Sequence, residues 1–157
     1  FIRQNVFDPA GMTHASFPDL EHIADVPVGY TTFFESEPEP IAATDVLPWS
    51  GSAAGGGVAS ATDLLRFFNA LRSDILLSSD TLAIATEASE TGWYGLGFVT
   101  QGGKHPLWGH GGFGYGMNVA AQRFPDDEVT FICVATRDMA CDRMIYAWSD
   151  RLFGAVE

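Results

Sequence analysis

Residues 107–136 read LWGHGGFGYGMNVAAQRFPDDEVTFICVAT, and this stretch predicts most of the fold. Three strand candidates follow one another in it, at 107–113, 117–124 and 129–136. Glycines separate the first two, and a turn that begins at Pro125 separates the last two. Consecutive strands joined by such short turns indicate an antiparallel sheet.

The sequence also predicts a fourth strand and a sheet that is covered on both faces. Residues 93–100 alternate around glycine and end at Gly102-Gly103, which predicts a further strand and a turn. The run VTFICVA at 129–135 is apolar on both faces. We therefore expect the sheet to be covered on both sides.

Two helices are predicted before the sheet. Ser60 is a plausible N-cap, and Asp63 falls in the first turn, where the helix dipole favours a negative charge. The apolar residues of this first helix share one face: Leu64, Leu65, Phe67, Phe68 and Leu71. A second, shorter helix is expected from Ser79 to about Ala88.

A last helix is predicted over roughly 140–153, with Asp138 as a candidate cap. Its apolar residues also share a face: Met144, Ile145, Trp148 and Leu152. Helices, then an antiparallel sheet, then a C-terminal helix packed on that sheet define an α+β architecture.

The N-terminal third is less regular. Residues 1–12 read as the end of a helix that breaks at Asp8-Pro9, because proline disfavours helix before it. Residues 13–57 are expected to form an irregular arm, with short strands or turns around 26–34. Residues 58–90 are then helical, and 93–157 hold the sheet and the last helix.

Composition limits the classes of function. The chain has 157 residues and is 46% apolar, as expected of a globular domain with a core. Its formal net charge of −12 disfavours nucleic acid and anionic membrane surfaces as partners. No apolar run reaches the ~18 residues that suggest a membrane span. The chain begins at Phe1 without a signal segment, which leaves its localisation undetermined.

No metal or cofactor is expected. His14, His22 and His105 are scattered and read as surface or loop histidines, without the spacing of a metal site. Cys133 lies in an apolar run and is interpreted as a buried core thiol, and two cysteines do not make a disulfide scaffold.

The sequence Gly109-His110-Gly111-Gly112-Phe113-Gly114 is the candidate site. It fits G-x-G-x-x-G, but a dinucleotide site needs a helix directly after it, and a strand-like segment follows. A second interpretation is a strand edge held open for a ligand, with exposed N–H groups beside a histidine. A glycine-rich hairpin with a structural histidine explains the pattern equally well, and the spacing does not separate the two.

A search for a nucleophile gives negative results. Both G-x-S-x-G and S-x-x-K are absent, and Lys104, the only lysine, has Gln101 three residues before it. Ser50 and Ser52 lie near a glycine-rich turn but have no base at a diagnostic spacing, so we interpret them as loop serines.

A series of segments, in order, resembles the family of class C β-lactamases, D-alanyl-D-alanine carboxypeptidases and related serine esterases. The matching segments are Phe7-Asp8-Pro9-Ala10-Gly11-Met12, Gly29-Tyr30, the run from Ala54 to Phe67, Tyr94-Gly95-Leu96-Gly97-Phe98, and Gly109-His110-Gly111-Gly112. The resemblance covers nearly the whole chain and corresponds to the C-terminal half of the family's fold, so residues 1–157 would form a single partial domain.

The resemblance implies a site on the predicted strand at 107–113. The family's third motif, K-T-G or H-x-G, falls on His110, Gly111 and Gly112, and the residue after it, Phe113, would supply an oxyanion N–H from its backbone. Gly114 would also lie against the substrate. Gly111 stands where Thr or Ser is common, so a hydroxyl for a substrate carboxylate is missing and an ester or amide substrate becomes as plausible as a penicillin-like acid.

The resemblance also implies what this chain lacks. In the family, S-x-x-K lies on a helix of the other half and Y-x-N stands before the element that resembles residues 7–12, and the two motifs provide the nucleophile and its base. Neither motif occurs in this chain. We therefore expect a fragment of a serine hydrolase that is inactive alone. Its expected partners are a small-molecule or peptide-like substrate and either the N-terminal half of the same protein or a second copy, paired through the edge of the strand at 129–136. The alternative is a non-catalytic domain that binds a peptide-like ligand.

Overall fold

A computed structural model describes residues 1–18, 26–34, 39–45, 51–52 and 54–154. Four antiparallel strands form its main sheet in the order β3-β4-β5-β6. Their bounds are Val99–Gln101, Leu107–Gly114, Met117–Phe124 and Val129–Ala135. The last three lie where the sequence predicted them, and the α+β class with a C-terminal helix is confirmed.

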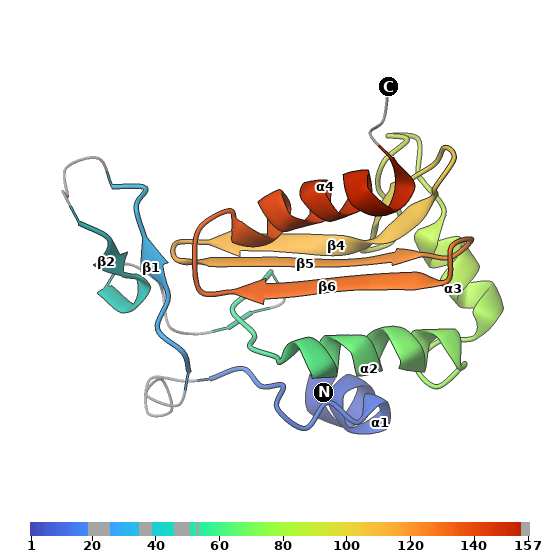
Figure 1. Cartoon of the computed structure of the whole chain (residues 1–157). Coiled ribbons are helices and arrows are strands. Elements are labelled where there is room, and N and C mark those ends of the chain that lie inside the picture. The colour runs from blue at the N-terminus through green and yellow to red at the C-terminus, as the bar shows by residue number, and fades with distance from the viewer. Residues whose placement is uncertain (19–25, 35–38, 46–50, 53, 155–157) are drawn as a thin grey trace.

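Helices cover both faces of this sheet, as the two-sided apolar pattern of β6 predicted (Figure 1). Helix α4 (Ala140–Phe153) packs on one face, where its Ile145 and Trp148 contact Phe131. Helix α2 (Ala61–Arg72) packs on the other, where Phe68 stacks on Trp108 with ring centroids 5.1 Å apart. Helix α3 (Ser79–Thr86) follows α2.

The predicted N-cap of α2 is present and is part of a larger cluster. Ser60 Oγ accepts from the backbone N–H of Asp63, whose carboxylate accepts from the backbone N–H groups of Ser60 and His14 and from the Arg66 side chain. The Asp63 side chain is fully buried. Burial alone would raise the pKa of Asp63, but these hydrogen bonds outweigh it and hold the pKa below its usual value.

The break predicted at Asp8-Pro9 is wrong. A π-helical turn (Arg3–Phe7) continues without interruption into α1 (Asp8–Ala10), and the helix ends at Gly11, which has a left-handed φ of 69°. Pro9 lies inside this continuous segment, where its fixed φ suits helix although its missing N–H removes one backbone hydrogen bond.

The arm after α1 contains a small sheet of β1 (Tyr30–Thr31) and β2 (Ile41–Ala42), followed by a 3₁₀ turn (Ala43–Asp45). In Figure 1 this sheet lies beside the β4–β5 turn. Asp138, predicted to cap α4, makes this connection instead: its carboxylate accepts from the N–H of Thr32 and from the N–H of Gly116. Met139 occupies the N-cap position without a side-chain cap.

Two further expectations are corrected. Cys133 on β6 is not a free thiol but forms a disulfide with Cys141 in the first turn of α4, with 5.4 Å between the Cα atoms. The strand predicted at 93–100 is reduced to Val99–Gln101. Before it, the chain turns tightly at Gly97, where φ is 88°, and Gly95 donates its N–H to the Phe98 carbonyl.

Candidate functional site

The predicted site residues lie together on β4, at an edge that is partly open. Strand β3 pairs only with residues 107–109 of β4, while β5 pairs with 108–114. Within the part of the chain that the structure describes, His110 to Gly114 therefore have no neighbouring strand on the β3 side. His110, Gly111, Gly112 and Phe113 are all exposed. The backbone of this segment is thus accessible to a ligand.

The direction of the Phe113 N–H follows from one hydrogen bond. The carbonyl of Gly112 accepts from Asn118 Nδ2 on β5 at 3.1 Å. In a trans peptide the C=O and the following N–H point in opposite directions. Because the Gly112 C=O faces β5, the Phe113 N–H faces the open edge, as a donor to a substrate oxygen must.

His110 is held by Tyr94, which the sequence placed in a family-like segment without a role in the site. Tyr94 Oη and His110 Nε2 are 2.9 Å apart, and the two rings meet edge to face with centroids 5.7 Å apart. His110 Nδ1 also contacts the Gly111 carbonyl. Both ring nitrogens are therefore occupied, which fixes the imidazole beside the glycine-rich backbone.

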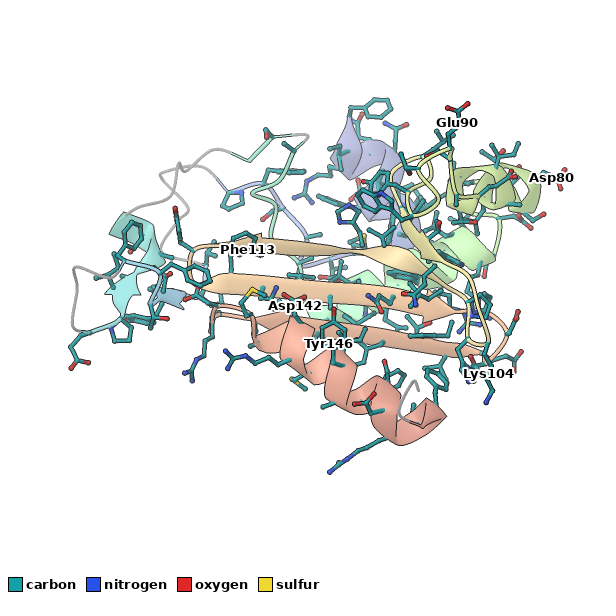
Figure 2. All side chains as sticks on the ribbon, turned by 90° about the horizontal axis from the view of Figure 1, so that it is seen from above. Asp80, Glu90, Lys104, Phe113, Asp142 and Tyr146 are labelled. Atoms are coloured by element: carbon teal, nitrogen blue, oxygen red, sulfur yellow. A yellow bond between two sulfur atoms is a disulfide. The ribbon has the colours of Figure 1, made fainter. Side chains whose placement is uncertain are left out.

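Aromatic side chains flank the far end of β4. Phe113, which is 66% exposed, meets Phe33 edge to face at 6.0 Å, and Phe34 lies 4.9 Å from Tyr115. Figure 2 shows Phe113 at the end of the sheet that β1 and β2 approach. The arm thus contributes an aromatic wall to the site, which nothing in the local sequence pattern indicated.

A small apolar cavity of about 210 Å³ lies against the same stretch of β4. It is lined by His110, Gly111 and Gly112, and by the apolar residues Leu64, Phe67, Phe68, Phe98, Val119 and Ala121. Its walls carry almost no polar surface, so it suits a hydrocarbon group.

The other candidates do not converge on this site. His14 lies 3.7 Å from the Asp63 carboxylate. His105 lies 3.0 Å from the Asp127 carboxylate and stacks on Phe153, so its side chain has more fixed contacts than the predicted loop histidine would have. Ser52 takes part in a local turn with Gly55. His22 and Ser50 fall outside the described residues. Among the described residues, no group of three His, Cys, Asp or Glu side chains could hold a metal ion.

Local geometry excludes a dinucleotide site at the glycine-rich segment. A turn at Tyr115-Gly116 and then β5 follow Gly114, so the helix that a dinucleotide fingerprint requires is not present there. Of the helices in the described part of the chain, none is long and apolar enough to cross a membrane.

An antiparallel sheet between helices, with a glycine-rich strand open at one edge among the described residues, defines an α+β domain whose candidate site is that edge. The chain belongs to the Beta-lactamase family, whose sequence model matches residues 1–151. No curated protein matches the sequence.

Solved structures share the fold. A penicillin-binding protein from Bacillus halodurans is 19% identical, with a TM-score of 0.79 over 94% of this chain and 47% of its own. A D-stereospecific amidohydrolase from Streptomyces sp. is 20% identical, with a TM-score of 0.72 over 99% and 48% of the two chains. A D-amino acid amidase from Ochrobactrum anthropi is 23% identical, with a TM-score of 0.69 over 86% and 43%. The chain therefore spans less than half the length of each of these proteins.

Proposed function

We propose that this chain is the C-terminal half of a serine hydrolase that cleaves esters or amides through an acyl-enzyme. Its share of the active site is the strand segment from His110 to Gly114, and the Phe113 N–H is one donor to the substrate oxyanion. The observation that carries the proposal is the outward direction of that N–H on an open, glycine-rich edge beside a fixed histidine.

The substrate is proposed to be neutral at the position that Gly111 faces. A threonine or serine there would offer a hydroxyl to a carboxylate, and glycine offers none. The apolar cavity and the aromatic residues Phe33 and Phe113 favour a hydrophobic acyl group. Amide hydrolysis agrees with the names of two structural neighbours, the D-amino acid amidase and the D-stereospecific amidohydrolase.

The nucleophile and its base are proposed to come from a polypeptide segment outside these 157 residues. With Lys104 as the only lysine and no S-x-x-K, the chain has no activated serine of the family's type. A serine-directed fluorophosphonate probe tests this directly. The longer protein should be labelled at one serine and should hydrolyse a fluorogenic acyl ester, whereas the 157-residue chain should show neither property. Stoichiometric labelling of the 157-residue chain would refute the proposal.

The missing half is also the proposed partner. In the part of the chain that the structure describes, strand β6 lies at the edge of the sheet, and its Val134 is 43% exposed. On α4, Met144 and Tyr146 are 57% and 74% exposed. A strand with one open edge next to exposed apolar residues is a surface for pairing with another segment. Residues N-terminal to this chain, or a second copy, would extend the sheet at β6.

Sedimentation velocity tests the association. The chain alone should self-associate, and a co-expressed N-terminal half should replace the self-association with a 1:1 complex. A stable monomer with no affinity for that half would refute it. A non-catalytic domain that binds a peptide-like ligand is the alternative, and it predicts ligand binding to the longer protein without labelling by the probe.

A further inference from the structure

Asn118 on β5 uses every hydrogen-bonding position of its side chain. It is 1% exposed. Its Oδ1 accepts from the backbone N–H groups of Cys141 at 2.7 Å and Asp142 at 3.0 Å, and its Nδ2 donates to the Gly112 carbonyl and to the Asp142 carboxylate, both at 3.1 Å. An amide is the side chain that offers two donors and an oxygen with two lone pairs in this arrangement.

The Gly112 bond acts on the peptide that carries the candidate oxyanion donor. Gly112 C=O and Phe113 N–H belong to one planar unit, so a donor that holds the carbonyl toward β5 also fixes the N–H toward the open edge. Hydrogen bonding at the carbonyl polarises the unit and makes the N–H a stronger donor.

The other half of the amide anchors this contact to a rigid support. Asn118 Oδ1 sits at the N-terminus of α4, where two backbone N–H groups of the first turn lack helical partners. Cys141 in that turn is fully buried and is tied to β6 by its disulfide with Cys133. Figure 2 shows Asp142 at this end of α4, against the sheet. Asn118 thus joins α4 and β6 to the backbone of the site.

We propose that Asn118 is a positioning residue that sets the direction and donor strength of the Phe113 N–H, with α4 as its support. The inference rests on the proposed function for its catalytic consequence, but its structural part concerns the Gly112–Phe113 peptide alone. It assigns α4 a role in the chemistry of the site in addition to covering the sheet.

Selective labelling allows a direct test. Among the 157 residues, the dipeptide Gly-Phe occurs only at Gly97-Phe98 and Gly112-Phe113, so ¹³C′-glycine with ¹⁵N-phenylalanine gives two filtered amide signals from this part of the protein. In Asn118→Asp the carboxylate still accepts from the helix N–H groups but cannot donate to Gly112. The Phe113 amide should move upfield in ¹⁵N and ¹H, while the Phe98 amide stays in place as an internal reference.

The controls separate positioning from folding. Asn69→Asp makes the same chemical change at an exposed position of α2 and should move neither signal. Asn118→Asp places two carboxylates together, and adding Asp142→Asn removes that repulsion without restoring a donor to Gly112. The double variant should therefore recover stability while the Phe113 signal remains displaced. A Phe113 signal at its wild-type position in the double variant would overturn the inference.

A measurement on the wild-type protein decides the question if neither variant folds. A through-hydrogen-bond scalar coupling between Asn118 Nδ2 and the Gly112 carbonyl carbon supports the inference, and its absence overturns it.

Kinetics of the full-length protein then distinguish this inference from the proposed function. The double variant should lower kcat by roughly tenfold to a hundredfold, less than removal of an oxyanion donor itself, with KM almost unchanged. If the wild-type protein hydrolyses no acyl substrate, the proposed function fails while the amide signals still decide the role of Asn118. An active double variant with unchanged kcat and a displaced Phe113 signal overturns the catalytic part of the inference alone.

Discussion

Reduction of the Cys133–Cys141 disulfide should destabilise the fold by a predictable amount. The two cysteines are eight residues apart, and closing a loop of that size in the unfolded chain corresponds to about 2.5 kcal/mol of native stability by the chain-entropy relation. With a urea dependence of roughly 2 kcal/mol per molar, the unfolding midpoint should fall by about 1 M.

Urea titration followed by tryptophan fluorescence measures this shift, because Trp148 of α4 packs against Phe131 of β6 and loses that contact on unfolding. The oxidised protein should show no reactive thiol after denaturation, and the reduced protein should show two. The variant Cys133→Ala/Cys141→Ala serves as control, since reductant should not change its midpoint. Equal midpoints for the oxidised and reduced wild-type protein, or two free thiols before reduction, would refute the reasoning.

Further predictions concern charge, backbone space and the histidine contact. Asp63→Ala should cost about 2–3 kcal/mol in urea unfolding, because it leaves the N-cap cluster of α2 and the His14 N–H without their acceptor; a cost under 0.5 kcal/mol would contradict this account. Asp63 and Asp138 both have a folded pKa below the usual 3.8, so their stabilisation is complete above the unfolded pKa and is lost as pH falls through the lower folded value. Stability should therefore decline below about pH 4, and Asp138→Asn should make that decline shallower; an unchanged acid limb in chemical denaturation would be the contrary result. A Cβ at Gly112 would meet no atom within 4 Å, so Gly112→Ala should leave the urea unfolding midpoint within about 0.5 M of wild type. The added methyl group should weaken ester hydrolysis by the full-length protein. Loss of stability with intact hydrolysis would contradict this expectation. Tyr94→Phe removes the hydroxyl that meets His110 at 2.9 Å and should lower kcat/KM about tenfold with little change in stability, and unchanged kcat/KM would show that the contact does not matter to the site.

The sequence predicted the parts of the fold that depend on local periodicity. Strand β5 has the expected bounds because it lies between the glycine-rich turn at Gly114–Gly116 and the turn at Pro125, and helix α4 because its apolar stripe runs over fourteen residues. Ser60 and Asp63 form the expected start of α2 because a capping box is local.

The errors arise where tertiary contacts decide. Cys133 and Cys141 form a disulfide only because α4 packs over β6 at an angle that brings the two residues together. The spacing of two cysteines in the sequence does not predict that angle. Asp138 lies at a position where an N-cap is expected, but its carboxylate instead accepts from the N–H groups of Thr32 and Gly116, which come from distant segments. Pro9 reads as a helix breaker, but the helical backbone continues through it to Ala10.

The sequence predicted where the candidate site lies but not which side chains hold its residues in place. The glycines around His110 were visible because their density is unusual. Tyr94 was matched only as the start of a family-like segment, and Asn118 gave no signal. Each takes its role in the site from a partner on another segment, which the local sequence does not show.

The contact between Asp138 and the Gly116 N–H has a consequence for where the chain tolerates changes in length. A Cβ at Gly116 would lie 2.6 Å from the Tyr30 backbone nitrogen, so the β4–β5 turn and the arm are in close contact. Residues inserted at Tyr115-Gly116 would separate the arm from the sheet and displace Phe33 from Phe113. The turn at Gly102-Gly103 is exposed, and a Cβ at either glycine meets nothing within 4 Å. Length variation among homologues, and any inserted epitope tag, should therefore be accommodated at Gly102-Gly103 and excluded from the turn beside the site.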